Sequence, residues 1–395
     1  MIDIIECKGF KAAGVAAGLK KNGEQDIGLI FSEVPANAAG VFTKNMVQAA
    51  PVLLDKERIK SGACRAIIVN SGNANCCTGH QGMVDANAMA NFVASGLKIS
   101  EDHVLVASTG VIGESLDIEK IKTAVPDLIK ALSKEGIHDL AKSIMTTDTF
   151  PKIVTRQGSI NGKPYTITGV AKGSGMIRPD MATMLCFICS DVDAGPDLLK
   201  DALFNSTERS FNRITVDGDT STNDMVIIMA NGLSGAAIKT AEHKDSFQSV
   251  LDDAMINLAR LVVKDGEGAT KLVEIVVKGA LTEKDAFKAA DTVANSNLVK
   301  TAIFGEDANW GRILAAVGRS KISINPDRVD IFFDDVLLVK NGMKYSDEAE
   351  IFATKVLKKP EFTILIDLKM GNGTAFMFTC DFSLEYIRIN ADYRS

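Results

Sequence analysis

The chain has 395 residues, of which 46% are hydrophobic and 24% charged, a composition typical of a globular protein long enough for two domains. Its 44 basic and 50 acidic residues give a formal net charge of −6, which argues against nucleic-acid binding because there is no basic excess to meet phosphates. No apolar run approaches the roughly 20 residues of a membrane helix, and the start lacks the pattern of a signal or transit peptide, so we expect a cytoplasmic protein with no membrane partner.

The apolar runs along the chain are short and are separated by Gly, Asn and Asp, which favours many strands. The predicted strands are 27–31, 66–69, 104–107, 153–156, 184–190, 225–229, 272–277, 329–333, 362–368 and 374–379. The predicted amphipathic helices are 83–97, 115–132, 196–204, 247–263 and 283–295. Asn161-Gly162, between two strand-like runs, predicts a hairpin. Because helices and strands alternate irregularly, we expect a layered α/β fold and not a simple parallel sheet.

The character of the sequence changes around 279–284. A strand pattern ends there, a helical run follows, and further strands come after it. We therefore expect an N-terminal domain over residues 1–280 and a smaller C-terminal α/β domain over 281–395.

The most informative local pattern surrounds the bond between Ala182 and Thr183. A Gly-rich, polar run over 172–181 leads to Thr183, and the apolar run 184–189 follows at once. A flexible loop fixed to a buried strand, with a hydroxyl at the junction, is the layout expected of a protein that cuts itself to make an N-terminal Thr nucleophile. The freed α-amine, with an ordinary pKa of about 7.7–8.0, can then act as the base. An ordinary Gly-rich loop entering a strand has the same pattern, so this alternative stays open.

Two other kinds of chemistry receive less support. The chain has four histidines and no Gly-x-Ser-x-Gly, which favours a base other than His. Cys186 and Cys189 have the spacing of a redox or metal pair, but residues three apart in a strand point to opposite faces. We expect these cysteines to be buried packing residues in a reducing compartment, and we expect no metal site.

An acyl-transfer enzyme also needs donors aimed at the oxyanion that develops during the reaction. The segment 108–113 follows a predicted strand and precedes a predicted helix, so its backbone N–H groups would be exposed in a strand-to-helix turn. The functional interpretation is an oxyanion hole made by the Thr109 hydroxyl and the Gly110 N–H. The alternative is a plain turn with a Ser or Thr cap.

Sequence motifs along the whole chain resemble those of the ornithine acetyltransferase family, the bifunctional glutamate N-acetyltransferases of arginine biosynthesis. The matching segments are Lys8–Gly14, Asn70–Asn75, Ser108–Gly113, Thr146–Thr149, Lys172–Leu185, Asp265–Lys271, Gly305–Arg312 and Arg388–Ala391. The resemblance implies an N-terminal α/β sandwich that carries Thr183 and a smaller domain that closes over the site. It also implies ping-pong transfer of an acetyl group from N-acetylornithine to glutamate, with no metal and no resident cofactor. Whether acetyl-CoA is a second donor stays open.

The resemblance further assigns roles to individual residues. It implies self-cleavage between Ala182 and Thr183, Thr183 as the nucleophile, and Thr109 with Gly110 as the oxyanion pair. The residues that match its substrate-binding positions are Thr146, Lys172, Thr183, Glu267, Asn390 and Ser395. The last residue is Ser395 where the family often has Thr, but the hydroxyl is retained. The mature protein would be two self-generated chains, assembled as a heterotetramer with two of each.

Each substrate-binding assignment has an ordinary structural alternative. Lys172 could be a solvated surface residue, Glu267 an exposed turn residue, and Thr146 a helix cap. The polar segment 211–224 is interpreted as a hydrogen-bonded loop that supports Thr183, with direct substrate contact as the alternative. Near the C-terminus, 384–390 is apolar enough that we expect it to dock on the protein body and present Asn390 and Ser395 to the substrate.

Two competing functions remain. An N-terminal-nucleophile aminopeptidase or amidohydrolase would share the cleavage but release its acyl group to water. A non-enzymatic redox or metal-binding protein would instead use Cys186 and Cys189.

Overall fold

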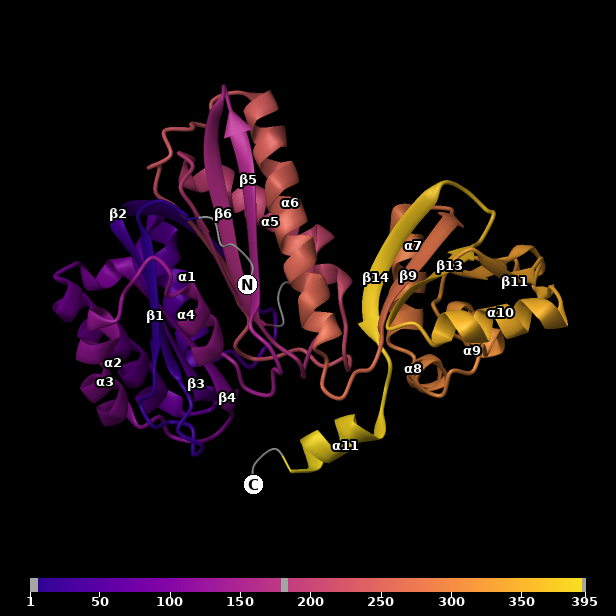
Figure 1. Cartoon of the computed structure of the whole chain (residues 1–395), viewed down its shortest axis with the longest axis horizontal. Coiled ribbons are helices and arrows are strands. Elements are labelled where there is room, and N and C mark those ends of the chain that lie inside the picture. The colour runs from indigo at the N-terminus through magenta and orange to yellow at the C-terminus, as the bar shows by residue number, and fades with distance from the viewer. Residues whose placement is uncertain (1–5, 179–183, 393–395) are drawn as a thin grey trace. The chain divides into compact units, whose positions relative to one another are not determined.

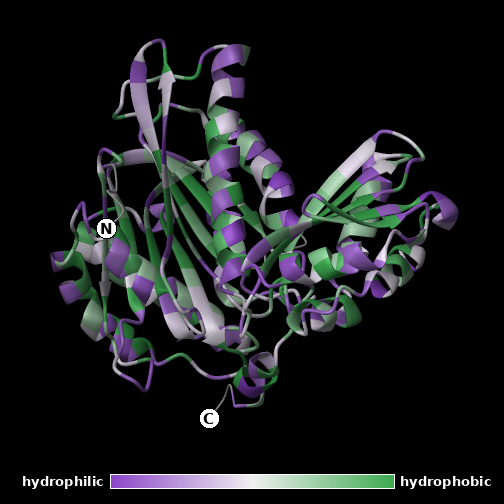
Figure 2. Ribbon diagram, turned by 45° about the vertical axis from the view of Figure 1, so that its right-hand side comes forward, coloured by the Kyte–Doolittle hydropathy of each residue, from purple (hydrophilic) through white to green (hydrophobic). Residues whose placement is uncertain are grey.

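The computed structural model describes residues 6–178 and 184–392. Contacts divide the chain into two compact units (Figure 1). Unit 1 comprises Met1–Asn212 with Asp219–Val262, and unit 2 comprises Arg213–Gly218 with Val263–Ser395. In both units hydrophobic residues follow the strands and the sides of the helices that pack on them (Figure 2).

Unit 1 is built on a mostly antiparallel sheet in the order β4-β3-β2-β8-β7-β6-β5, with β1 paired to β2. Its strands are β1 Phe10–Val15, β2 Ile27–Phe42, β3 Ala63–Asn73, β4 Val104–Val111, β5 Lys152–Ile160, β6 Lys163–Lys172, β7 Leu185–Ser190 and β8 Met225–Ala230. Its helices are α1 Ala50–Arg58, α2 Gly79–Leu97, α3 Ile118–Lys130, α4 Ile137–Ser143, α5 Pro196–Arg209 and α6 Ala241–Lys264, the last of which runs across the boundary into unit 2.

The two faces of this sheet enter different cores because strand side chains alternate with a period of two. On β3, Ala66 and Ile68 pack in a cluster with α2 and α3. Ile67 and Val69 belong to a second cluster, which includes α4 and residues of β6, β7 and β8. Helices therefore cover a sheet that is buried on both faces, and the expected layered α/β fold is confirmed.

Unit 2 is built on a six-stranded sheet in the order β12-β11-β10-β13-β9-β14. Its strands are β9 Leu272–Ala280, β10 Asp330–Phe333, β11 Val336–Lys340, β12 Met343–Lys344, β13 Glu361–Asp367 and β14 Gly373–Cys380. Its helices are α7 Glu283–Ala294, α8 Asn297–Phe304, α9 Trp310–Gly318, α10 Asp347–Leu357 and α11 Leu384–Ala391. The sequence places the domain boundary at residue 280. The contacts place it at Val262/Val263, because β9 pairs with β13 and β14 and so belongs to the second sheet.

Most predicted elements occur at the expected places. The hairpin between β5 and β6 turns at Asn161 and Gly162, both with a positive φ, as a two-residue hairpin turn requires. One difference affects the site: β4 continues to Val111, so Thr109 and Gly110 lie in a strand and not in a strand-to-helix turn. The helix predicted from residue 115 begins only at Ile118. Within the described residues, no helix is both long and apolar enough to cross a membrane.

The core of unit 2 predicts a clear contrast between two isoleucines. Ile275 on β9 is fully buried, whereas Ile351 on α10 is 60% exposed. We expect Ile275→Ala to lower the free energy of unfolding of this unit by about 2–5 kcal/mol, because a cavity is left in the core. The matched control Ile351→Ala should change it by less than about 0.5 kcal/mol. The single tryptophan, Trp310, packs against this core, so its fluorescence during urea unfolding reports on unit 2. Equal shifts for the two variants would contradict this description of the core.

Candidate active site

The end of β4 holds the two expected oxyanion residues in a fixed position. β4 runs parallel to β3, with Ser71 opposite Thr109 and Gly72 opposite Gly110. Gly110 has a φ of +132°, and a Cβ there would lie 2.4 Å from the carbonyl carbon of Gly72. Only glycine therefore fits this position, and the sheet itself, rather than a loop, orients the backbone.

A buried asparagine joins the segment before β8 to the ends of β3 and β4. The amide nitrogen of Asn223 donates to the carbonyl oxygens of Ala74 and of Ser108, the residue before Thr109. The Ser108 hydroxyl donates to Oδ1 of Asn70 at 2.6 Å. These bonds brace the strand end that carries Thr109.

The polar segment 211–224 does not form a single supporting loop. Arg213–Gly218 belongs to unit 2, where Thr215 N donates to the carbonyl of Phe378 at 3.0 Å. Its last part lies beside the described residues that flank the cleavage segment: the Thr220 hydroxyl donates to the carbonyl of Arg178 at 3.0 Å, and directly after Asp224 Met225 N donates to the carbonyl of Met184 at 3.0 Å. Direct contact of this segment with substrate stays a prediction.

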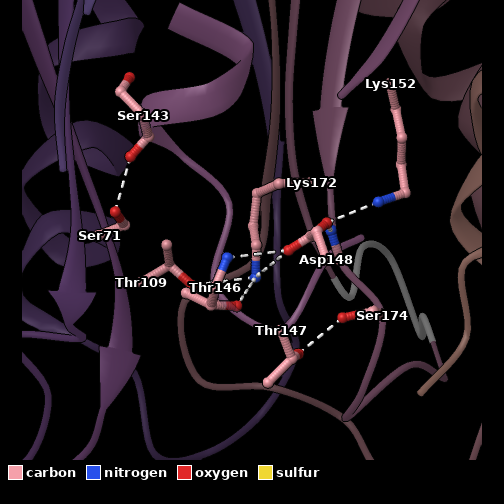
Figure 3. A network of polar contacts seen from close by, with 10 residues as sticks. Ser71, Thr109, Ser143, Thr146, Thr147, Asp148, Lys152, Lys172 and Ser174 are labelled. Carbon is pink, nitrogen blue, oxygen red and sulfur yellow. Dashed lines mark hydrogen bonds and ion pairs between the residues drawn. The ribbon is translucent and has the colours of Figure 1, made fainter. Parts of the chain in front are cut away.

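Lys172, the last residue of β6, is the centre of a buried polar network (Figure 3). Its Nζ donates to the hydroxyl of Thr146 at 3.0 Å and to that of Thr109 at 3.3 Å, and it lies 3.8 Å from Oδ2 of Asp148. The alternative of a solvated surface lysine is therefore wrong. Thr109, Thr146 and Lys172 were all expected in the site. The ammonium group of Lys172 joins the three, although they come from separate segments of the chain.

Asp148 is the buried anion of this network, and the sequence contains no separate indication that it belongs to the site. Its Oδ1 accepts from Lys152 Nζ at 2.6 Å and from Gly173 N at 2.7 Å, and its Oδ2 accepts from Thr146 N at 3.0 Å. Burial opposes ionisation of this carboxyl, but the charges of Lys172 and Lys152 outweigh burial and hold its pKa well below the ordinary range. Two lysines and one carboxylate leave a net positive charge in a buried place, which favours binding of an anion.

Unit 2 brings two further expected residues together. Glu267 is buried in the turn before β9, and the side-chain amide of Asn390 on α11 donates to its Oε2 at 2.8 Å. The helix is also attached at its start, where the Ser383 hydroxyl donates to the carbonyl of Gly268 at 2.6 Å. The alternative that Glu267 is an exposed turn residue is therefore wrong. Its carboxylate accepts a hydrogen bond from Asn390, which is distant in the sequence.

The C-terminal helix does not bury its apolar side chains in the way the sequence suggests. In α11 Leu384 is 67% exposed and Ile387 is 64% exposed. Tyr386 makes the main contact, with its ring 4.5 Å from that of Phe382 and its hydroxyl 3.3 Å from Asp217. The helix is thus attached as expected, but through its cap, Asn390 and Tyr386, while Leu384 and Ile387 remain exposed.

The remaining expected site residues are Ala182, Thr183 and Ser395, and they lie outside the described residues. Of the others, the structure groups Thr109, Gly110, Thr146 and Lys172 in unit 1, and Glu267 with Asn390 in unit 2.

The cysteines do not favour a redox or metal function. Cys186 and Cys189 are free, buried thiols on β7, and burial raises the pKa of each. A thiol with a raised pKa is a poor nucleophile and a poor metal ligand. In the described part of the chain, no group of three or more His, Cys, Asp or Glu side chains could hold a metal ion.

Similarity to known proteins extends over nearly the whole chain. Residues 11–395 match the model of the ArgJ family. The chain is 52% identical over 390 residues to the arginine biosynthesis bifunctional protein ArgJ of Geobacter sulfurreducens, covering 98% of this chain and 99% of that protein. It is 48% identical to the glutamate N-acetyltransferase of Methanocaldococcus jannaschii, with 98% and 97% covered. A crystal structure of ArgJ from Bacillus halodurans is 42% identical with a TM-score of 0.50, and the match covers 52% of this chain and 97% of that chain.

The depressed pKa of Asp148 predicts a specific dependence of stability on pH. Asp148→Asn removes the anion between two buried lysines, which should lower the free energy of unfolding by about 3–5 kcal/mol at neutral pH. Because the carboxyl titrates below its ordinary range when folded, this stabilisation is complete above the unfolded pKa of about 3.9 and is lost as the pH falls below it. Urea unfolding at a series of pH values should therefore show the gap between wild type and variant narrowing in acid.

The control is Asp253→Asn, which removes the carboxylate of an exposed ion pair with Arg156 in the same unit. It should change stability by less than about 0.5 kcal/mol. A gap between wild type and Asp148→Asn that stays constant down to strong acid would contradict an ionised, buried Asp148.

Proposed function

This chain belongs to the ArgJ family, and we propose that it is an acyltransferase of arginine biosynthesis that moves an acetyl group from N-acetylornithine to glutamate. The names of its relatives and their coverage of the whole chain support this activity. The structural observation that carries the proposal is the contact of buried Lys172 with both Thr109 and Thr146. Two hydroxyls and a cation beside the end of β6, from which the chain continues towards Thr183, support this proposal.

The proposed reaction has two acyl transfers. The Thr183 hydroxyl gives its proton to its own α-amine and attacks the acetyl carbonyl of N-acetylornithine. The Thr109 hydroxyl and the Gly110 N–H stabilise the oxyanion, and ornithine leaves as its nitrogen takes up a proton. The amine of glutamate then attacks the acetyl-Thr183 ester, which releases N-acetylglutamate and restores the hydroxyl. A positioned amine outcompetes water because it is held next to the ester.

Self-cleavage would use the same hydroxyl before the first turnover. Thr183 attacks the carbonyl of Ala182, the peptide becomes an ester, and water opens it to leave a free N-terminal Thr. The half-length match to the Bacillus halodurans chain, 97% of which aligns with 52% of this chain, supports a mature form of two chains. We expect these chains to stay associated as a heterotetramer with two of each, in the cytoplasm.

Substrate binding follows from the charges that each unit provides. The net positive network around Lys172, with Thr146, suits an acyl oxygen or a carboxylate. Glu267, held by Asn390, suits an ammonium group of the amino acid, and Ser395 is assigned to the same end of the substrate. The reaction needs no metal or resident cofactor, because one residue supplies both nucleophile and base. Acetylation of glutamate with acetyl-CoA alone tests whether acetyl-CoA is a second donor.

The assignment of Thr183 predicts the mass of the purified protein. Intact-mass spectrometry should find two chains, 1–182 and 183–395. Thr183→Ala should leave one uncut, inactive chain, because the hydroxyl needed for both reactions is gone. Thr183→Ser should keep partial cleavage, since a hydroxyl remains.

Two results would contradict this assignment. One is a single uncut species that carries the activity, and the other is normal transfer by Thr183→Ala. Cleavage followed by release of acetate, with no transfer to glutamate, would instead support an N-terminal-nucleophile hydrolase.

The contact between Asn390 and Glu267 predicts a second effect. Asn390→Ala should raise the KM for N-acetylornithine and glutamate several-fold, because it removes a bond that orients the Glu267 carboxylate, while self-cleavage continues. Arg388→Ala is the matched control on the same helix, since Arg388 pairs only with exposed Glu385 in the described structure. If both variants keep the wild-type KM in steady-state assays, Asn390 does not belong to the substrate site.

A further inference from the structure

We propose that Asp381 is a positioning residue for Glu267. Its buried carboxylate ties the turn 265–271 to the end of β14, so that the Glu267 carboxylate stays in place to bind an ammonium group of the substrate. This rests on the proposed function, which assigns that ammonium group to Glu267. It adds a residue of unit 2 that lies outside all the motifs that indicated the site.

The turn that carries Glu267 has little stiffness of its own. It joins α6, which ends at Lys264, to β9, which begins at Leu272, and a glycine stands on each side of Glu267. Glycine loses more conformational freedom on ordering than any other residue. At Gly268 the close packing requires it, because φ is +67° and a Cβ would lie 2.6 Å from the backbone nitrogen of Tyr386. Contacts from outside the turn must therefore hold the Glu267 carboxylate in one place.

Asp381, the residue after β14, supplies three of these contacts. Its Oδ1 accepts from Thr270 N at 2.8 Å and from Lys271 N at 3.0 Å, and its Oδ2 accepts from the Thr270 hydroxyl at 2.6 Å. Both N–H groups precede the first residue of β9, so the carboxylate takes the place of a strand partner for them. Hydrogen bonds to an ionised acceptor are stronger than those between neutral groups. Asp381 thus fixes the backbone three residues beyond Glu267.

Lys300 on α8 fixes the strand end that carries Asp381. This lysine is buried, and its Nζ donates to the hydroxyl of Thr379 at 2.9 Å and to the carbonyl oxygen of Cys380, the residue before Asp381. The same Nζ lies 5.2 Å from the centre of the Phe382 ring, the residue after Asp381. Because the residues on both sides of Asp381 are held by one ammonium group, the turn is tied to the body of unit 2 and not only to its C-terminal helix.

The contacts of the C-terminal helix act at different points of the same turn. Ser383 donates to the carbonyl of Gly268 at 2.6 Å, and Asn390 donates to Oε2 of Glu267 at 2.8 Å. Asn390 therefore orients the carboxylate, whereas Asp381 and Ser383 set the backbone that carries it. Loss of Asp381 would leave the charge of Glu267 intact but free the turn, so that part of the binding energy of the substrate would be used to order it.

A double-mutant cycle with the full-length, self-processed enzyme tests this role. Asp381→Ala should raise the KM for N-acetylornithine about tenfold and change kcat less than about threefold, because the turn must be ordered when the substrate binds. In the Glu267→Gln background the same substitution should raise KM less than about twofold, because the carboxylate that it positions is already absent. Self-cleavage, measured by intact mass, should be complete in every variant, since the cleavage segment belongs to unit 1.

A conservative variant and a matched control separate positioning from a general loss of stability. Asp381→Asn keeps an oxygen that can accept from both backbone N–H groups, so its KM should stay within about threefold of the wild-type value. Asp334→Ala is the control in unit 2, because the described hydrogen bonds of Asp334 come from Thr363 N, at 2.9 Å, and from Lys359, and not from the turn 265–271. This control should leave KM unchanged.

A milder variant covers the case in which Asp381→Ala does not fold. Thr270→Val removes only the hydroxyl that donates to Oδ2 of Asp381 and keeps the size and branching of the side chain. It should raise the KM for N-acetylornithine about threefold in the wild-type background and much less in the Glu267→Gln background. A wild-type KM for Thr270→Val would then overturn the positioning role.

The wild-type assay distinguishes failure of the proposed function from failure of the positioning role. If the wild type does not transfer acetyl from N-acetylornithine to glutamate, the proposed function fails and the role of Asp381 fails with it. If the wild type transfers normally but Asp381→Ala keeps the wild-type KM, or raises it equally with and without the Glu267 carboxylate, Asp381 does not act through Glu267. The positioning role alone is then overturned, as it also is if Asp381→Asn is as impaired as Asp381→Ala.

Discussion

The candidate site in unit 1 depends on one buried carboxylate, that of Asp148. Asp148 lies between two lysines and accepts two backbone N–H groups, so it remains ionised where an isolated carboxylate would be protonated. Through Lys172 it fixes the hydroxyls of Thr109 and Thr146, and through Gly173 N it fixes the first residue after β6. The geometry of the expected oxyanion donor and the start of the segment towards Thr183 are thus set by the same group.

The sheet brings these residues to one place from separate parts of the sequence. Lys172 ends β6 and Thr109 lies near the end of β4, while Asn223 precedes β8 and bonds to the residue before Thr109. Because rigid strands carry Thr109 and Gly110, these expected donors can be in position before the substrate binds. Gly110 allows β4 to lie this close to β3, because a side chain at position 110 would collide with the backbone of β3.

The sequence predicted local features of this fold well and distant contacts poorly. The short apolar runs predicted strands such as 272–277, and Asn161-Gly162 predicted the hairpin, because both depend on neighbouring residues. Thr109 and Lys172 were recognised through family motifs, since nothing local indicates that residues 63 apart share a hydrogen bond. Asp148 was missed because its contacts with Lys172 and Gly173 join distant parts of the chain. Lys152, four residues later, could have indicated an ion pair with Asp148. The segment 384–390 is attached as expected, but Leu384 and Ile387 stay exposed, because apolar composition does not specify which side chains of a short helix are covered.

An acetyl group that passes through Thr183 leaves a covalent acyl-enzyme, and trapping this species tests the proposed role of Thr183. Processed enzyme is mixed with N-acetylornithine in the absence of glutamate, quenched with acid, and mapped by peptide mass spectrometry. We expect one added acetyl group on Thr183 at the start of the second chain, and its loss when glutamate is added before the quench. An enzyme that turns over only with both substrates present and never carries acetyl on Thr183 would contradict it.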